Sequence, residues 1–365
     1  MLDFDTNILS YVFNIVYLVF IFGFSFFSQK LQVNIALGKI SKSLKKLQNM
    51  RDKAKEEAVS AIVKFGKPET DPKPRVESLL QFFSISPNNM DPNGVVKRLE
   101  HLVNSGDNRF KDEIKLLAPS ADEKQLQNLG NLVETAHGLN LLYRTVRHHY
   151  LAGKKGGSIY TMTQIQMELP MIMEEAEAYF SFIDAFKQEK PIGDGIGPLV
   201  ASTLIADAPV RSIAEETIAA DVTIDDRKVI VTRAQGPGGT CGKAGDAVST
   251  LVEEHKEQFS MIVMVDAGLK LEGETSATVV EGIGAAIGGV GIEQFKIEEI
   301  ATKHKIPLFA IVVRQSLKEA LAPMTDAVRG SVDEVLKRIK RLVSERTKAG
   351  DKIMIVGVGN TIGVA

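Results

Sequence analysis

Three acidic residues in the last third of the chain lie at or just beyond the ends of hydrophobic runs that are typical of β-strands. They are Asp246, Asp266 and Glu281. Carboxylates that share one edge of a sheet push their pKa values apart, so one can hold a proton while another activates water or binds a metal. The pattern predicts a hydrolase-like, peptidase-type site with Asp246 and Glu281 as acid and base. Asp266 is expected to be a third carboxylate or a metal ligand, and a divalent metal is the one cofactor that these residues suggest.

Glycine-rich loops follow the same hydrophobic runs, at 235–247, 266–275, 281–291 and 357–365. Because glycine has no Cβ, its backbone can approach a ligand or another loop closely. We therefore expect a ligand site where these loops meet, with glycine amides and one lysine holding an anionic group. The predicted binding residues are Gly236, Gly238, Gly239, Lys243, Gly282, Gly284, Gly288, Gly289 and Asn360.

The first of these loops supports a competing hypothesis. The sequence GPGGTCGK at 236–243 resembles a P-loop, and the run MIVMVD at 261–266 resembles the strand and aspartate that hold magnesium. Two positions depart from the motif. Pro237 stands where the first glycine is needed, and Ala244 stands where a hydroxyl should bind magnesium. A nucleotide- or phosphate-binding domain with a degenerate P-loop therefore remains the alternative.

The chain contains a single cysteine, Cys241, in the same loop. One cysteine excludes an intramolecular disulfide and any metal site built from several cysteines. A thiol before a helix can be activated as a nucleophile, but no histidine is positioned by sequence to serve it. We expect Cys241 to be a small packed residue.

We do not expect nucleic acid to be a partner. The formal net charge is −2, so the chain as a whole has no excess of positive charge that would attract it. The segment PIGDGIGPLVASTLI at 191–205 resembles a helix–hairpin–helix element, which binds phosphodiesters. Its acidic surroundings favour a tight joint between domains instead.

The elements that position these residues fall into an α/β domain at 221–365. Short hydrophobic runs at 228–233, 260–266, 277–281, 307–313 and 352–358 alternate with helical segments. Five such strands with helical crossovers predict a mainly parallel, covered sheet. Ser331 and Glu334 are expected to form the capping box of the last helix.

The preceding regions are expected to be helical. Apolar residues at helical spacing predict an all-α domain at 68–220. Residues 31–67 form either a basic stalk near lipid headgroups or a short coiled coil. A heptad-like stripe of Leu37, Ile40, Leu44 and Leu47 suggests a homodimer through 37–58.

The N-terminal segment 1–30 predicts a membrane anchor. Residues 8–27 carry no charge, and at about 1.5 Å per residue they would cross a hydrocarbon core of about 30 Å. Lysines follow this segment, whereas the leading tail is acidic. The positive-inside bias therefore places the N-terminus outside and the bulk of the chain in the cytoplasm.

Two families resemble this chain. The order of a glycine turn, a strand ending in Val-Asp-Ala, and an acidic residue opening GIGAAIGGVG over 228–313 is similar to the phosphorylase/hydrolase-like fold of spore germination proteases and hydrogenase-maturation peptidases. That resemblance implies that Asp246 and Glu281 are the two essential acids. Three features depart from the pattern: the turn reads GPGG, the second acid is glutamate, and Gly-Val-Gly-Asn occurs at 357–360 instead.

Over its full length the chain resembles an archaeal family known as domain of unknown function 1512. This resemblance implies an archaeal membrane protein and no particular reaction. A non-catalytic membrane scaffold or sensor, whose loops bind a ligand or a partner, is the remaining alternative to an enzyme.

Overall fold

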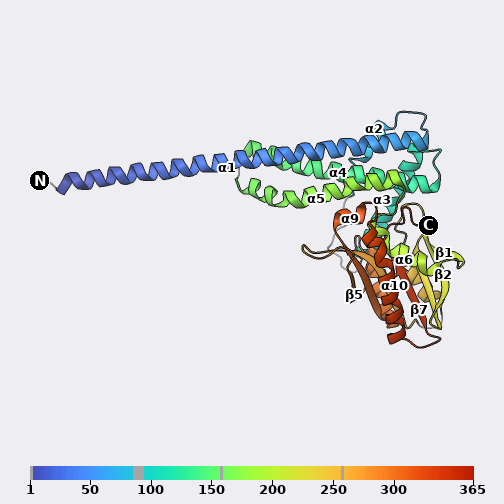
Figure 1. Cartoon of the computed structure of the whole chain (residues 1–365). Coiled ribbons are helices and arrows are strands. Elements are labelled where there is room, and N and C mark those ends of the chain that lie inside the picture. Colours follow the sequence, from blue (N-terminus) through green and yellow to red (C-terminus); the bar gives the residue numbers. More distant parts are fainter. Residues whose placement is uncertain (1–2, 85–93, 157–158, 256–258) are drawn as a thin grey trace. The chain divides into compact units, whose positions relative to one another are not determined.

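The computed structural model describes residues 3–84, 94–156, 159–255 and 259–365, with side chains from residue 10 onward (Figure 1). The chain forms two compact units. The first combines residues 1–52 with 139–176, and the second combines 53–138 with 177–365. Each unit is considered separately below.

The first unit consists of helices. It contains most of α1 (Asp3–Ala61), the second half of α4 (Glu123–Gly156) and the first half of α5 (Ile159–Gln188). Val33, Ile40 and Leu47 of α1 are buried in this unit, and the guanidinium of Arg51 lies 4.1 Å from the ring centroid of Tyr143 on α4. The heptad-like stripe is thus largely covered by helices of its own chain, and the homodimer through 37–58 stays a prediction.

The N-terminal part of α1 is long and apolar enough to span a membrane. The side chains from residue 10 to residue 27 are all exposed. An apolar helix in the core of a soluble domain would bury such side chains. The structure thus agrees with the apolar span predicted at 8–27. The side of the membrane on which each end of the chain lies stays a prediction.

The second unit joins helices to a seven-stranded sheet. Its helical part contains the π-helical turn η1 (Ile62–Gly66), α2 (Lys73–Leu79), α3 (Val95–Leu117) and the remaining halves of α4 and α5. The 3-10 turn η2 (Gly193–Gly195) then leads into α6 (Ile196–Ile205).

The sheet has the order β1-β2-β3-β7-β4-β6-β5. Its strands are β1 (Val210–Ala214), β2 (Thr217–Ile224), β3 (Arg227–Ala234), β4 (Met261–Leu269), β5 (Val279–Ile283), β6 (Leu308–Gln315) and β7 (Lys352–Gly357). The four strands β3, β7, β4 and β6 run parallel, whereas β1, β2 and β5 pair antiparallel. The predicted α/β fold with a mostly parallel sheet is confirmed.

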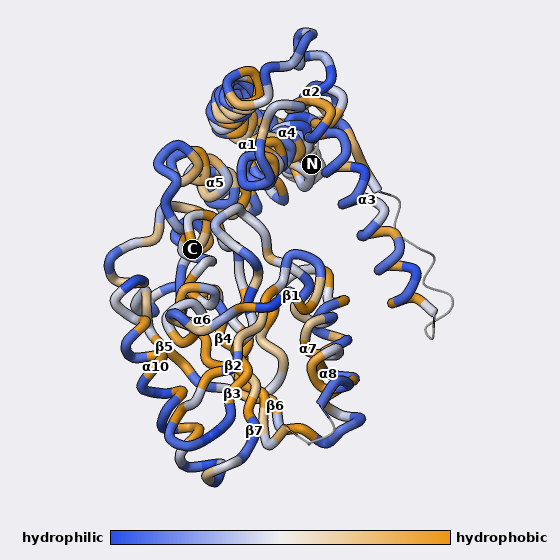
Figure 2. The backbone as a smooth tube through the Cα atoms, turned by 90° about the vertical axis from the view of Figure 1, so that its right-hand side faces the viewer, coloured by the Kyte–Doolittle hydropathy of each residue, from blue (hydrophilic) through white to orange (hydrophobic). Residues whose placement is uncertain are grey.

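Four helices cover the two faces of the sheet. Apolar residues of α6 and α10 (Asp326–Arg346) pack with Val229, Val263 and Ile355 on one face. Those of α7 (Ala244–Glu254) and α8 (Ile292–His304) pack with Ile230 and Met264 on the other. Figure 2 shows the hydrophobic strands between α10 on one side and α7 and α8 on the other. A short helix, α9 (Leu317–Leu321), follows β6.

Three local expectations were wrong. The hairpin β1–β2 occupies 210–224, much of which was assigned to the helical domain, because its short strands lack a clear apolar period. Strand β5 is antiparallel to β6, not parallel. Helix α10 begins earlier than expected, because its cap is Thr325, which accepts from the amide of Val328, and not Ser331. Ser331 lies inside the helix and donates its hydroxyl hydrogen to the Val328 carbonyl.

A glycine contact joins α6 to the sheet, while the domain joint expected at 191–205 stays a prediction. A Cβ on Gly197 would overlap the carbonyl oxygens of Val265 and Val358, which belong to β4 and to the residue after β7. The first turn of α6 can therefore lie directly on the ends of these strands only without a side chain at this position.

We expect Gly197→Ala to lower the free energy of unfolding by about 1–3 kcal/mol, because backbone atoms would have to move apart. Gly330→Ala on exposed α10 is the matched control, since nothing lies within 4 Å of that Cβ position. Helix propensity makes the control neutral or stabilising by up to about 1 kcal/mol. Denaturant unfolding of both full-length variants would measure the difference, and equal stabilities would contradict the close packing.

Candidate functional site

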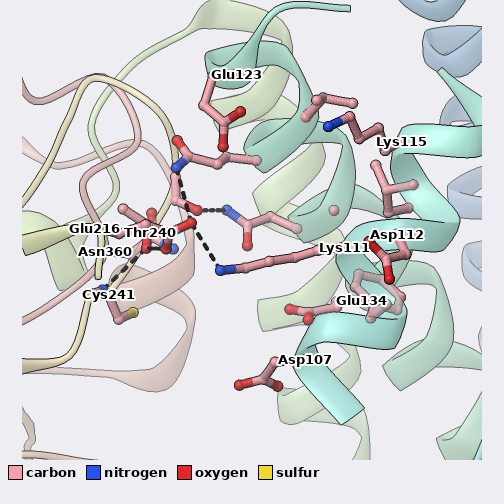
Figure 3. A pocket seen from close by; sticks show the side chains of 18 of the residues that line it. Asp107, Lys111, Asp112, Lys115, Glu123, Glu134, Glu216, Thr240, Cys241 and Asn360 are labelled. Carbon is pink, nitrogen blue, oxygen red and sulfur yellow. Dashed lines mark hydrogen bonds and ion pairs between the residues drawn. The ribbon is translucent and has the colours of Figure 1, made fainter. Parts of the chain in front are cut away.

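The second unit contains a pocket of about 500 Å³ at the carboxyl ends of β3 and β7. One wall is formed by α3 and α4, and the other by residues 239–243 after β3, with Asn360 after β7 and Glu216 from the β1–β2 turn (Figure 3). Ligands of parallel α/β sheets bind beyond the carboxyl ends of the strands. The pocket therefore lies where the fold most readily builds a site.

The glycine loop after β3 uses many of its amides within the protein. The Gly239 amide donates to Asn128 Oδ1 at 2.9 Å, and the Lys243 amide donates to Thr217 Oγ1 at 2.8 Å. At the start of α7, the Gly245 amide donates to Glu293 Oε2 at 2.6 Å. A P-loop leaves such amides free to bind phosphate. Here a carboxylate of the chain already occupies the helix N-terminus, which does not favour the P-loop hypothesis.

Glu216 connects four segments that build the pocket. Its carboxylate accepts hydrogen bonds from Thr240 Oγ1 of the glycine loop, from Gln127 Nε2 of α4 at 3.4 Å and from Lys111 Nζ of α3 at 3.0 Å. Partial burial alone would raise the pKa of Glu216, but the bonds from Thr240 and Lys111 outweigh burial and hold it below its ordinary value. Glu216 is therefore a charged structural link.

Lysine contacts hold α3 against the α/β part of the unit. Lys111 Nζ lies 2.7 Å from Glu215, Lys243 Nζ lies 3.1 Å from Asn104 Oδ1 of α3, and Lys296 Nζ lies 2.6 Å from Glu100 of α3. The buried residues of α3 are Ile114 and Leu117, both near its C-terminal end. This wall of the pocket is thus held by polar contacts over most of its length.

Two side chains with perturbed pKa values face the pocket. Glu134 is exposed at the pocket wall, and desolvation by the surrounding protein atoms, together with the neighbouring Asp107, raises its pKa to about 7. Cys241 is exposed to the pocket, and desolvation and the carboxylates of Asp194 and Glu134 raise its pKa above the ordinary range. Figure 3 shows Glu134 and Asp107 on the helical side and Cys241 on the loop side. Cys241 is therefore not fully packed, and its thiol stays protonated at neutral pH.

Asp246 and Glu281 are not brought together. Asp246 of α7 lies 2.6 Å from Lys296 Nζ on α8. Glu281 of β5 pairs with Arg341 and, at 3.5 Å, with Arg338, both on α10. The helices α7 and α10 cover opposite faces of the sheet. The expected convergence of the two acids is not observed, and their catalytic roles stay predictions.

The orientation of β5 explains this separation. Because β5 is antiparallel to β6, Ile283 lies beside Phe309 at the amino end of that strand. Gly282, near the end of β5, and the loop that follows with Gly284, Gly288 and Gly289 therefore begin at the end of the sheet opposite the pocket. Cβ positions on these glycines would meet nothing within 4 Å. Their predicted role in binding receives no support from close contacts.

The other predicted residues lie in or beside the pocket. Gly239, Lys243 and Asn360 line it. Gly236 lies against the carbonyl of Val364, and Gly238 against Gln127, so both serve close packing. Part of the predicted site thus coincides with the pocket.

Asp266 has a different acidic neighbour from those expected. It is buried within the second half of β4, and burial together with the charge of Asp194 raises its pKa to about 8. Burial also raises the pKa of Asp194, whose Oδ2 accepts from the Asn360 amide at 2.8 Å. Among the described residues, no group of three or more His, Cys, Asp or Glu could hold a metal ion. The metal role of Asp266 stays a prediction.

Sequence reasoning missed the helical wall of the pocket. Asp107 and Lys111 are four residues apart on α3, and Glu134 lies on α4, but such charges are typical of any solvated helix face. Asp194 was noted only as an acidic neighbour of a glycine turn. Their roles depend on tertiary contacts with a loop more than 100 residues away.

The fold and the pocket define a protein with a helical N-terminal region, one long apolar helix and an α/β domain with a pocket at the carboxyl ends of its parallel strands. Family models match both parts of the chain. The N-terminal domain of DUF1512, a protein of unknown function, matches 14–189, and the C-terminal domain of DUF1512 matches 192–365. The chain belongs to the DUF1512 family. A search of the curated proteins found no match. The archaeal origin implied by the resemblance stays a prediction.

We expect Cys241 to react with a neutral maleimide only at pH values well above those needed by an ordinary thiol, whose pKa is about 8.5. Removing a nearby carboxylate favours the thiolate, so Glu134→Gln should shift the rate profile toward lower pH. The remote Glu272→Gln is the control. The measurement is the labelling rate of the full-length protein against pH, and an ordinary profile in the wild type would contradict the carboxylate environment.

Proposed function

We propose that this protein is a membrane-anchored binding protein whose pocket takes a small cationic molecule, such as an amine or a guanidinium compound. The α/β domain then acts as a ligand sensor on the cytoplasmic side. The observation that carries the proposal is Glu134, an acidic group that faces the pocket without an ion-pair partner among the described residues.

The charge of the pocket supports a cation. Its lining residues include five carboxylates, those of Asp107, Asp112, Glu123, Glu134 and Glu216, and three lysines. Two of the lysines are already engaged, since Lys111 bonds Glu216 and Lys243 lies 3.7 Å from Asp107. A ligand amine would place its positive charge beside Glu134. This charge would offset the repulsion between the carboxylates of Glu134 and Asp107.

The backbone amides of the glycine loop also support a cationic rather than an anionic ligand. An anionic ligand such as a nucleotide would need free backbone donors, and the glycine loop has committed those of Gly239, Gly242 and Lys243 to side chains. An anion would also meet the acidic wall. The pocket chemistry therefore favours an amine over a phosphate.

We expect polyamines and guanidinium compounds, but not ATP with magnesium, to protect Cys241 from maleimide. Glu134→Gln should abolish most of this protection, while Glu272→Gln should leave it unchanged. Because a bound cation favours the charged form of Glu134, cation binding measured by calorimetry should weaken as the pH falls below about 7, where this carboxyl becomes protonated. Protection by ATP, with none by any cation, would contradict the proposal.

The anchor rests on the apolar part of α1 and the lysines that follow it. We propose that residues 8–27 cross the membrane once, with the N-terminus outside. Full-length protein should then stay with the membrane during alkaline carbonate extraction, and recovery in the soluble fraction would contradict the anchor.

A hydrolase is the second candidate function, because the buried Asp266 interacts with the half-buried Asp194, whose carboxylate accepts from the amide of the pocket residue Asn360. With its pKa at about 8, Asp266 can hold a proton at neutral pH, as the acid member of a catalytic pair requires. Asp266→Asn, tested against a panel of peptides and esters, should abolish turnover if this activity exists. Glu281→Gln should leave turnover unchanged, since the Glu281 carboxylate is ion-paired with arginines of α10.

A further inference from the structure

The end of the first unit nearest the apolar span has a defined packing. The start of α5 faces α1, since Ile159, Met162 and Gln166 line one small pocket of about 200 Å³ together with Gln32 and Ala36. Met162 is buried and lies so close to Gly153 of α4 that a Cβ there would overlap its side chain. The last turn of α4 and the first turn of α5 are thus fixed beside residues 32–36 of α1.

This end lies close to the membrane surface if residues 8–27 form the span. Gln32 lies five positions after Phe27, which amounts to about 7.5 Å of helix at 1.5 Å per residue. The headgroup layer on each side of a bilayer is about 5–8 Å thick, from a hydrocarbon core of about 30 Å and a total of about 40–45 Å. The adjoining ends of α4 and α5 are therefore placed at headgroup depth.

The residues at this end have the chemistry of a membrane interface. Lys30 of α1 and Lys154 and Lys155 of α4 are exposed. Tyr160 of α5 is 78% exposed and Leu151 of α4 is 46% exposed. Tyrosines are enriched where membrane meets water, and lysines next to a span attract anionic lipids.

The surrounding sequence carries charge of one sign only. No Asp or Glu occurs from residue 28 to residue 51 or from residue 139 to residue 167, whereas lysines and arginines occur in both segments. An exposed surface on a solvated helix bundle usually mixes both signs. The bias is complementary to an anionic lipid surface.

We propose that Lys30, Leu151, Lys154, Lys155 and Tyr160, here called the interface patch, bind the headgroups of anionic phospholipids in the leaflet next to the first unit. The inference rests on the proposed anchor, because the apolar span sets the depth of the patch. Its consequence is a second membrane contact that stops the helices of the first unit from tilting freely about the span.

The test uses full-length protein with Cys241→Ser as background and one fluorescent label on an introduced cysteine. The labelled positions are Tyr160→Cys in the patch, Met171→Cys as a matched control on α5, and Phe24→Cys in the span. Met171 is 73% exposed and lies 11 residues along the helix, or about 16 Å from Tyr160. The protein is placed in nanodiscs of phosphatidylcholine alone or mixed with phosphatidylglycerol, with a quencher on the headgroup or on the acyl chain.

We expect the headgroup quencher to reduce the signal at position 160 about twofold more than at position 171, and more strongly with phosphatidylglycerol. Lys154→Glu with Lys155→Glu should remove the dependence on anionic lipid, with helicity by circular dichroism unchanged. Equal quenching at 160 and 171, or quenching independent of phosphatidylglycerol, overturns the interface patch while the anchor stands. Absence of acyl-chain quenching at position 24 overturns the anchor and the patch together.

Discussion

The hydrogen-bonded carboxylate of Glu216 is the interaction on which the candidate site depends. It lies in the tight β1–β2 turn, where its backbone has a φ of 50°, and it accepts from Thr240, Gln127 and Lys111. These donors belong to the glycine loop, to α4 and to α3. One partly buried charge thus links two walls of the pocket that the hydrophobic core does not join. Removing it would leave the Thr240 hydroxyl without its acceptor and Lys111 with only Glu215.

The polar attachment of α3 has electrostatic consequences for the pocket. Exposed ion pairs are weak and screened by salt, so this wall should be less firmly held than α6, which packs on the sheet through Gly197 and Ile196. The arrangement also engages two of the three lysines that line the pocket, because Lys111 and Lys243 are paired with carboxylates while Lys115 also lines it. Within the part of the chain that the structure describes, Glu134 faces the pocket without an ion pair to a lysine, opposite a thiol kept protonated by its acidic surroundings. Both features point to recognition of a cation.

Hydrophobic periodicity predicts the parallel strands and the apolar N-terminal helix, because burial and membrane insertion leave regular patterns in sequence. It does not reveal that β5 runs antiparallel, and this direction determines whether Glu281 reaches the site or the opposite end of the sheet. The loop after β3 is predictable from its glycines, and Gly239, Lys243 and Asn360 do line the pocket. The roles of Glu134 and Glu216 cannot be predicted from the sequence. Each is an isolated charge, on a helix or in a turn, and only long-range contacts bring it to the pocket.

The central claim is that the Glu216 carboxylate holds α3 in place as a wall of the pocket. Hydrogen–deuterium exchange of the α3 amides, compared between the full-length wild type, Glu216→Gln and the control Glu272→Gln, tests it most directly. The account predicts faster amide exchange over 95–113 in Glu216→Gln alone, with exchange of α6 unchanged in all three proteins. Higher salt should also speed exchange over 95–113 in the wild type. Unchanged exchange of α3 in Glu216→Gln would contradict the claim.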